Sequence, residues 1–185
     1  MTRPMSRLLI RPAVASEAAD LTALVIRSKA YWGYSAEFME QAASELSVTE
    51  QEIADGKVSV AEVDRRPVGV SVLDLHDPPE LVALFVDPDL IGTGIGRALL
   101  QHALERARHA GLQSVLIESD PNAERFYRSQ GATPIGQRTS PTTGRELTLL
   151  QLSVAAPTEA RDSERARRAS SWSPGAIAEP ANQQR

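Results

Sequence analysis

Three glycines at alternate positions mark the stretch of this sequence that most plainly suggests chemistry. Gly92, Gly94 and Gly96 stand in "LFVDPDLIGTGIGRALL", residues 84–100, between an apolar run that predicts a strand and an amphipathic run that predicts a helix. Alternate glycines leave main-chain N–H groups unshielded, and the positive end of the helix dipole adds to their effect. The loop therefore predicts an anionic ligand, such as a phosphate group, at the start of the helix.

Two nucleotide-binding motifs and an unliganded turn are the alternatives for this loop. A dinucleotide fingerprint needs Gly-x-Gly-x-x-Gly after the first strand of its sheet. Here the third glycine comes one residue early and other strands are expected before it, although Glu118 lies about where a ribose-binding acid would. A P-loop is excluded because the loop lacks Gly-Lys-Ser/Thr. An unliganded turn would leave its N–H groups exposed to no purpose, but on these residues alone it and the dinucleotide interpretation stay open.

A second motif follows, one predicted helix and one predicted strand later. The stretch "SDPNAERFYRSQGA", residues 119–132, predicts a capped helix that begins in an Asx-type turn and ends at a glycine. Its characteristic positions are held by Asn122, Ala123, Phe126, Tyr127 and Gly131.

Together the two stretches resemble the GNAT superfamily of N-acetyltransferases. In that family Val-x-Pro ends a strand before Gln/Arg-x-x-Gly-x-Gly/Ala, and a later helix carries Ala-x-x-Phe-Tyr. The first motif is matched by Val86, Pro88, Gly94 and Gly96. Ile91 departs from it, because it stands where the family has Gln or Arg. The resemblance covers about residues 6–154 and is strongest over 80–132.

The resemblance implies acetyl-CoA as the acyl donor, with no metal. The loop amides are expected to bind the pyrophosphate, and Arg97 is placed to pair with a phosphate. The strand before the loop is expected to offer free backbone groups to the pantetheine arm, a role that falls on Phe85 and Val86. The full set of expected coenzyme contacts is Phe85, Val86, Ile91, Gly92, Thr93, Gly94, Ile95, Gly96, Arg97, Asn122 and Phe126.

Acetyl transfer to an amine needs a neutral nucleophile, a polarised thioester and a proton for the departing thiolate. By resemblance, Tyr127 is the proton donor beside the coenzyme sulfur. Glu80, at the start of the strand before the loop, is the expected general base and would act through water. His76, between Asp74 and Asp77, is another candidate base, because an unperturbed histidine titrates near neutral pH.

The acceptor amine is expected between the first loop and a late hairpin. In "KAYWGYS", residues 29–35, Tyr31, Trp32 and Tyr34 could form an aromatic wall for an alkylammonium or an aromatic amine. In "TSPTTGREL", residues 139–147, Arg145 could bind an acceptor carboxylate. The sequence equally allows Trp32 to pin the loop to the core, and Arg145 to be a surface residue.

Hydrophobic periodicity predicts the elements that must position these residues. A helix capped by Ser16 should bury Leu21, Leu24, Val25 and Ser28, and a second helix should run from Ser35 to Leu46. An antiparallel hairpin should follow from residue 57, and the strand at 81–86 should be buried on both faces. Further strands are expected at 8–11, 114–119, 133–138 and 146–154. With the resemblance, this order predicts a mixed α/β GNAT-type fold: a central, mostly antiparallel sheet with one splayed parallel pair and helices on both faces.

The whole chain of 185 residues suits one domain, expected at 1–155, followed by a disordered tail at 156–185 in which Trp172 is the odd aromatic residue. The absence of cysteine excludes disulfides, thiolate ligands and a cysteine nucleophile, and it fits a reducing cytoplasm. A net charge of −4 gives no electrostatic reason to expect nucleic acid or an anionic membrane as a partner. No apolar run is long enough to be a membrane span or a signal-peptide core.

The sequence therefore predicts a cytoplasmic N-acetyltransferase that moves acetyl from acetyl-CoA to a primary amine of a small molecule, by direct attack in a ternary complex. Its expected partner is the small-molecule amine acceptor, without nucleic acid or membrane, and a homodimer is allowed. The alternative is a GNAT-like module that binds acyl-CoA without turnover, as a sensor or a partner protein.

Overall fold

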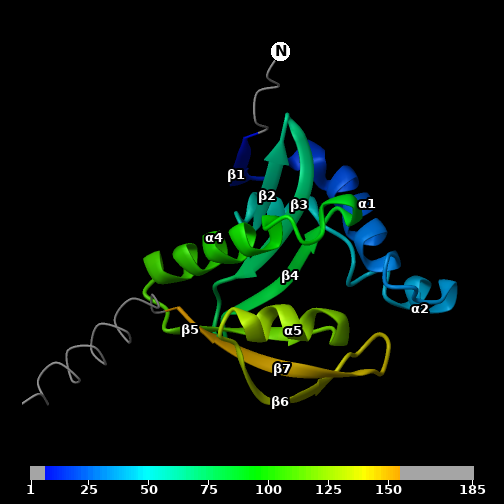
Figure 1. Ribbon diagram of the computed structural model, residues 1–185, viewed down its shortest axis with the longest axis vertical. Helices are drawn as coiled ribbons and strands as arrows, with labels where there is room; N and C mark the ends of the chain where they lie inside the picture. Colours follow the sequence, from blue (N-terminus) through cyan, green and yellow to red (C-terminus); the bar gives the residue numbers. More distant parts are fainter. Residues whose placement is uncertain (1–6, 155–185) are drawn as a thin grey trace, which may run out of the picture. The chain divides into compact units, whose positions relative to one another are not determined.

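One twisted sheet of seven strands organises the computed structural model, which describes residues 7–154 (Figure 1). The strand order is β1-β2-β3-β4-β5-β7-β6, and every neighbouring pair is antiparallel except β4 and β5. The strands are β1 (Leu8–Pro12), β2 (Val58–Val63), β3 (Arg66–Asp74), β4 (Glu80–Val86), β5 (Ser114–Ser119), β6 (Thr133–Thr139) and β7 (Glu146–Ser153). The predicted mixed α/β fold, with its mostly antiparallel sheet and one parallel pair, is confirmed.

Helices lie on both faces of this sheet. They are α1 (Ala18–Ala30), α2 (Ala36–Gln41), α3 (Glu50–Ala54), α4 (Ile95–His109) and α5 (Pro121–Ser129), with short 3-10 turns η1 (Ala15–Glu17) and η2 (Pro88–Leu90). No helix among residues 7–154 is long and apolar enough to cross a membrane. The expected domain end at 155 and the tail at 156–185, with Trp172, lie outside the described residues and stay predictions.

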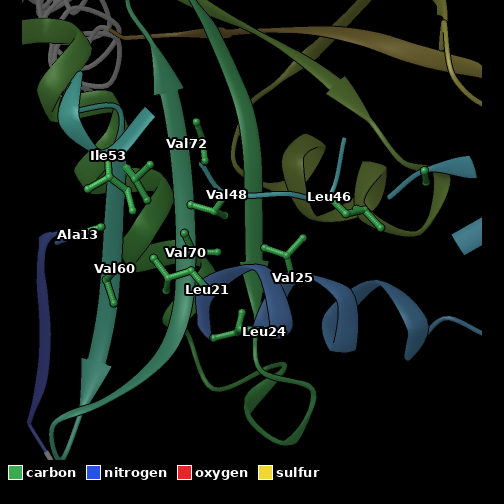
Figure 2. Close-up of a cluster of buried hydrophobic side chains, with 12 residues drawn as sticks. Ala13, Leu21, Leu24, Val25, Leu46, Val48, Ile53, Val60, Val70 and Val72 are labelled. Carbon is green, nitrogen blue, oxygen red and sulfur yellow. The ribbon is translucent and has the colours of Figure 1, made fainter. Parts of the chain in front are cut away.

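The core divides between the two faces of the sheet. On one face, α1 buries the predicted stripe Leu21, Leu24, Val25 and Ser28, and its apolar members pack on Val60, Val70 and Val72 (Figure 2). On the other face, Ile95 and Leu99 of α4 pack on Ala61 of β2, which alternates with Val60, and on Val68 of β3, which lies at a break in the register between β2 and β3. The alternating residues of β2 therefore pack on α1 on one side of the sheet and on α4 on the other.

The N-terminal helices differ from the prediction in three ways. Ser16 lies inside η1 rather than capping α1, and Glu17 instead accepts a hydrogen bond from the Val14 amide at 2.9 Å. Ser35 does cap α2, but that helix ends at Gln41 because the following turns bury Ala42, Leu46 and Val48 against the α1 side of the core. The short helix α3 was not predicted, although Thr49 and Glu52 form a capping box at its start.

Strand β4 is not buried on both faces, contrary to the prediction. Leu81 is fully buried, but Val82 is 55% exposed at a break in the register between β3 and β4. From Ala83 to Val86 the strand is half-buried. The reason is that its neighbour β5 departs from it, which leaves the carboxyl-terminal half of β4 with only one partner strand.

Candidate acetyl-transfer site

The glycine loop places an open helix N-terminus at the end of β4. Gly92 and Gly94 have φ values of +84° and +93°, a left-handed conformation in which side chains are strained, and no atom lies within 4 Å of an added Cβ at either position. Gly94 is the N-cap of α4, so the first N–H groups of that helix point past it with no intrahelical acceptor. These N–H groups, beside the positive end of the helix dipole, have the geometry of an anion site.

The strands β4 and β5 touch at one end only. Their parallel pairing consists of Glu80 opposite Leu116, and the Leu116 amide donates to the Pro79 carbonyl at 2.9 Å. Beyond that point they diverge toward the glycine loop (Figure 1). The gap leaves backbone groups of β4 available to a ligand that runs along the strand.

The direction of those backbone groups can be read from the pairing with β3. The Asp87 amide donates to the Val68 carbonyl of β3 at 2.8 Å. Because backbone groups alternate between the two sides of a strand, Phe85 shares this direction while Leu84 and Val86 face the diverging side. Val86 therefore lies as expected, whereas the main chain of Phe85 turns to β3 and its side chain packs on the α1 cluster. Leu84, which the sequence reasoning did not select, has its backbone groups on the diverging side.

Helix α5 closes the site from the side of α4. Gly96 lies where an added Cβ would be 3.5 Å from the Val86 side chain and 3.8 Å from the Phe126 ring. The ring of Phe126 meets that of Tyr127 edge-on, with centroids 5.2 Å apart. The predicted loop, strand and helix motifs are thus brought together around one point, the start of α4.

Tyr127, the predicted proton donor, is a buried residue of α5. It is 6% exposed and packs in the core between α4, α5 and the β5 face that carries Val115 and Ile117. Burial raises the pKa of the Tyr127 hydroxyl well above its ordinary value, and the negative charge of Asp120 acts in the same direction. The hydroxyl therefore keeps its proton before reaction, although its pKa lies further from that of a thiol than the sequence suggested.

Glu80 is not a free carboxylate. Arg138 Nη1 lies 3.2 Å from Glu80 Oε2, and the same nitrogen donates to Glu118 Oε1. The hydrogen bond to Glu118, followed by the charges of both carboxylates, raises the pKa of Arg138, although burial acts against it. Arg138 was not predicted as a site residue, and Glu118 was weighed only as a ribose ligand. No local pattern could have shown that the two meet Glu80.

The histidine alternative lies in an exposed turn. His76 Nδ1 is 2.5 Å from Asp74 Oδ1, and the His76 side chain is 84% exposed. Lys57 Nζ bonds the other Asp74 oxygen at 2.8 Å, and the hydrogen bonds from Lys57 and His76 hold the pKa of Asp74 far below its ordinary value. His76 is thus tied to a structural ion pair, and among the candidate bases Glu80 keeps the better position.

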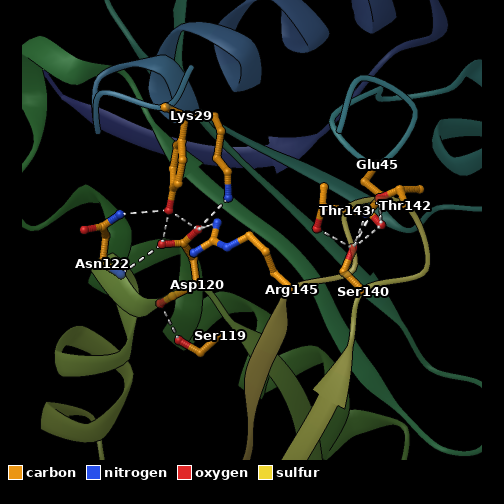
Figure 3. A network of polar contacts seen from close by, with 10 residues as sticks. Lys29, Glu45, Ser119, Asp120, Asn122, Ser140, Thr142, Thr143 and Arg145 are labelled. Atoms are coloured by element: carbon orange, nitrogen blue, oxygen red, sulfur yellow. Dashed lines mark hydrogen bonds and ion pairs between the residues drawn. The ribbon is translucent and has the colours of Figure 1, made fainter. Parts of the chain in front are cut away.

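Asp120 is the centre of a polar network on the side where the acceptor is expected, and the sequence reasoning did not select it. Its carboxylate accepts hydrogen bonds from Lys29 Nζ at 2.6 Å and from the Tyr34 hydroxyl at 2.6 and 2.8 Å. It also accepts one from the backbone amide of Asn122 at 2.9 Å (Figure 3). Burial alone would raise the pKa of Asp120, but these hydrogen bonds outweigh it and lower the pKa below its ordinary value. Because Asp120 also caps α5, the network joins the first loop to the helix that carries Tyr127.

The expected aromatic wall divides into two parts. Tyr34 stacks on Phe38 with centroids 4.5 Å apart, and burial, followed by the hydrogen bond to Asp120, raises the pKa of Tyr34. Tyr31 and Trp32 instead form an edge-to-face pair that is 58% and 45% exposed, respectively. Trp32 therefore does not pin the loop to the core, and of the three aromatic residues Tyr34 alone lies in the Asp120 network.

Asn122 belongs to the acceptor network rather than to the coenzyme side alone. Its side-chain amide donates to the Tyr34 hydroxyl at 2.9 Å. Arg145 reaches the same network from the hairpin, with its guanidinium 5.1 Å from the ring centroids of both Tyr34 and Phe38. The structure thus brings Arg145 beside Tyr34, and its role toward an acceptor stays a prediction.

The late hairpin is anchored at a second point. Its turn, which contains Ser140 and Thr142, bonds Glu45 in the segment after α2; Ser140 Oγ lies 3.1 Å from Glu45 Oε1 (Figure 3). Ser140 is buried and also accepts from the Thr143 hydroxyl and amide. The turn between β6 and β7 is therefore held at Glu45 after α2, while Arg145 at its other end contacts Tyr34 of the first loop.

A family model described as an acetyltransferase (GNAT) domain matches residues 14–142. The chain belongs to the GNAT acetyltransferase family. A curated relative, the peptidyl-lysine N-acetyltransferase YjaB of Salmonella typhimurium, is 34% identical over 94 residues. That match covers 46% of this chain and 63% of YjaB, so it spans less than two thirds of the relative's length.

Two solved structures extend the similarity of this GNAT domain to the whole fold. A GCN5-related N-acetyltransferase from Rhodopseudomonas palustris superposes with a TM-score of 0.69 at 25% identity, over 83% of this chain and 99% of the other. The acetyltransferase yncA from Salmonella typhimurium, solved with its cofactor acetyl-CoA, gives a TM-score of 0.59 at 25% identity, over 83% and 99% of the two chains.

Proposed function

We propose that this GNAT domain transfers an acetyl group from acetyl-CoA to the primary amine of a small molecule. One observation carries the proposal: the open N-terminus of α4 lies where β4 and β5 diverge, next to the buried Tyr127. Donors for a phosphate, backbone groups for an extended arm and a protonated hydroxyl thus follow one another along a single path. The acetyl-CoA bound to the related yncA supports this choice of donor.

The residues that would hold acetyl-CoA follow from this path. The N–H groups of Ile95, Gly96 and Arg97 at the start of α4 suit the pyrophosphate, and the backbone of Leu84 and Val86 suits the pantetheine amides. When bound, acetyl-CoA supplies the thioester whose carbon–sulfur bond breaks. Ile91 is 40% exposed at the rim of the loop, where it offers a backbone contact and no side-chain hydrogen bond.

The chain's own residues then move two protons. Glu80, through water, takes one from the acceptor ammonium so that the neutral nitrogen can form a bond to the acyl carbon. Tyr127 gives its hydroxyl proton to the sulfur that leaves. The nitrogen loses its second proton as the amide forms, and that proton restores the Tyr127 hydroxyl, so the proton taken through Glu80 is the one released to water. For Glu80 to act, Arg138 must shift its hydrogen bonds toward Glu118, the partner to which it already lies closer.

Bonds between separate segments favour a small acceptor. Asp120 ties Lys29 and Tyr34 to α5, while Glu45 holds the turn of the hairpin. Segments tied in this way would have to part to admit a folded protein surface, whereas a small molecule does not require that. YjaB is a peptidyl-lysine N-acetyltransferase, so a lysine side chain is the competing acceptor class.

Release of coenzyme A thiol from acetyl-CoA, measured with a panel of small primary amines and lysine peptides, tests the proposal. We expect amine-dependent release that Tyr127→Phe lowers about 100-fold in kcat or more, with the KM for acetyl-CoA nearly unchanged. Tyr31→Phe, which alters an exposed ring, is the matched control. Preference for peptides would correct the acceptor class. Tight coenzyme A binding without amine-dependent thiol release would favour the alternative, a module that binds acyl-CoA without turnover. The ion pair between Glu80 and Arg138 is the feature that favours this alternative.

A further inference from the structure

Two charged clusters lie on the same face of the sheet, opposite α4. Val115 and Ile117 of β5 are buried on the side of α4 and α5, so Leu116 and Glu118 point to the other side. Asp120 follows Glu118 by two residues and continues that side. Successive same-side positions of a strand are about 7 Å apart, so the two clusters are close neighbours.

The cluster around Asp120 has one cation too many. The Asp120 carboxylate already accepts from Lys29, Tyr34 and the Asn122 amide. Arg145 Nη1 is left 3.9 Å from Asp120 Oδ2, beyond hydrogen-bond distance. The guanidinium rests on aromatic faces instead, 31% exposed and without a hydrogen-bonded carboxylate among residues 7–154.

The cluster around Arg138 has one carboxylate too many. Glu80 and Glu118 are 20% and 24% exposed, and both contact the same guanidinium nitrogen of Arg138. Partly buried charges are stable only when they are paired, so each cluster is one partner short. The Asp120 cluster could take a further anion, and the neighbouring Arg138 cluster could take a further cation.

We infer that the acceptor amine carries an anionic group, with its ammonium at Glu80 and Glu118 and its anionic group at Arg145. The inference rests on the proposed function, and it names the substrate class of that site: a small amino acid, or an amine that bears a phosphate, whose two charged groups are a few bonds apart. Such a molecule neutralises both clusters at once, whereas a plain alkylamine leaves Arg145 with only its long ion pair to Asp120. Arg145 and Glu118 are then specificity-determining residues.

Matched acceptors test the inference directly. Each pair is one amine offered as its free carboxylate and as the uncharged amide, with a phosphate-bearing amine as a third arm, and kcat/KM is measured for each. We expect the anionic member to be preferred by about tenfold or more, the effect of one hydrogen bond to a charged group. Arg145→Gln should bring this ratio close to one, while Arg145→Lys, which keeps the charge, should retain a preference. Arg125→Gln, on an exposed part of α5, is the control and should leave the ratio unchanged.

A charge reversal protects the test against loss of folding in a single variant. Arg145→Glu should favour an amine that carries a second ammonium group over its anionic counterpart. Equal kcat/KM for the anionic and the uncharged acceptors in the wild type, or the same ratio in wild type and Arg145→Gln, would overturn the inference and leave the acetyltransferase proposal standing. Absence of thiol release with every amine would overturn both.

Discussion

The two ends of this site differ in the groups they present: main-chain groups at one end and charged side chains at the other. The donor end, from β4 through the glycine loop to α4, presents backbone groups fixed by glycines at positive φ and by the divergence of two strands. The acceptor side presents charged side chains that four separate segments bring together: α1, the first loop, the end of β5 and the late hairpin. One end depends on the path of the main chain, and the other on which side chains meet.

This difference explains what each end can tolerate. A backbone site is expected to survive the replacement of a side chain, so the proposed coenzyme site tolerates Ile91 where the family has Gln or Arg. A network of charges depends on every member, because removing one leaves a partly buried partner unpaired. The donor end is therefore expected to be sensitive to added Cβ atoms, and the acceptor side to lost charges.

The largest expected effect is on the acceptor side, with Asp120→Asn. Lys29, 14% exposed, would keep its charge without a carboxylate, so we expect the free energy of unfolding in urea to fall by about 2 to 3 kcal/mol at pH 7. The pKa of Asp120 is lowered by folding, so this contribution is present above the ordinary Asp pKa of about 4 and is lost as the pH falls through the folded value. The difference between variant and wild type should therefore shrink in acid.

Asp20→Asn, at an exposed position in the first turn of α1, is the control for Asp120→Asn and should cost only a few tenths of a kcal/mol. Coenzyme A affinity should change little in Asp120→Asn. An equal loss of coenzyme and acceptor binding would show that the two ends are not separate.

An intermediate effect is expected with Gly69→Ala, in the strand β3 on which α4 and β4 pack. The added Cβ would lie 2.9 Å from Leu99 Cδ1 of α4 and 3.2 Å from the Phe85 carbonyl oxygen, which cannot move away freely. We expect a loss of about 1 to 2 kcal/mol in unfolding free energy, together with weaker coenzyme A binding because α4 shifts. Gly136→Ala in β6, where no atom lies within 4 Å of the added Cβ, should be close to neutral.

The smallest effect is expected in the loop itself, with Gly94→Ala. At φ +93° alanine is strained although the space around it is open, so stability should fall by about 1 kcal/mol. Gly111→Ala, at φ +78° beyond the other end of α4, should lose about as much. Calorimetric titration with coenzyme A separates the two: Gly94→Ala should bind more weakly and Gly111→Ala should not. Equal affinities would mean that the loop does not bind the coenzyme.

Prediction from the sequence succeeded where one local segment carries the signal. The glycine loop, the capped helix at 121–129 and the hairpin strands were all predicted within a residue or two, because periodicity and capping are local properties. It failed where burial depends on a distant neighbour. Strand β4 looked buried on both faces, but no run of its own residues could show that β5 leaves it after one residue pair.

The sequence by itself determined the order of the strands, the open N-terminus of α4 and the presence of a tyrosine one helix later. Only the tertiary structure decided that Arg138 lies between Glu80 and Glu118, and that Asp120 receives hydrogen bonds from Lys29 of α1 and Tyr34 of the first loop. The physical reason is the strand order. Placing β7 between β5 and β6, and α1 across β3 and β4, sets side chains from segments far apart in the chain on one face, and their charges combine only there.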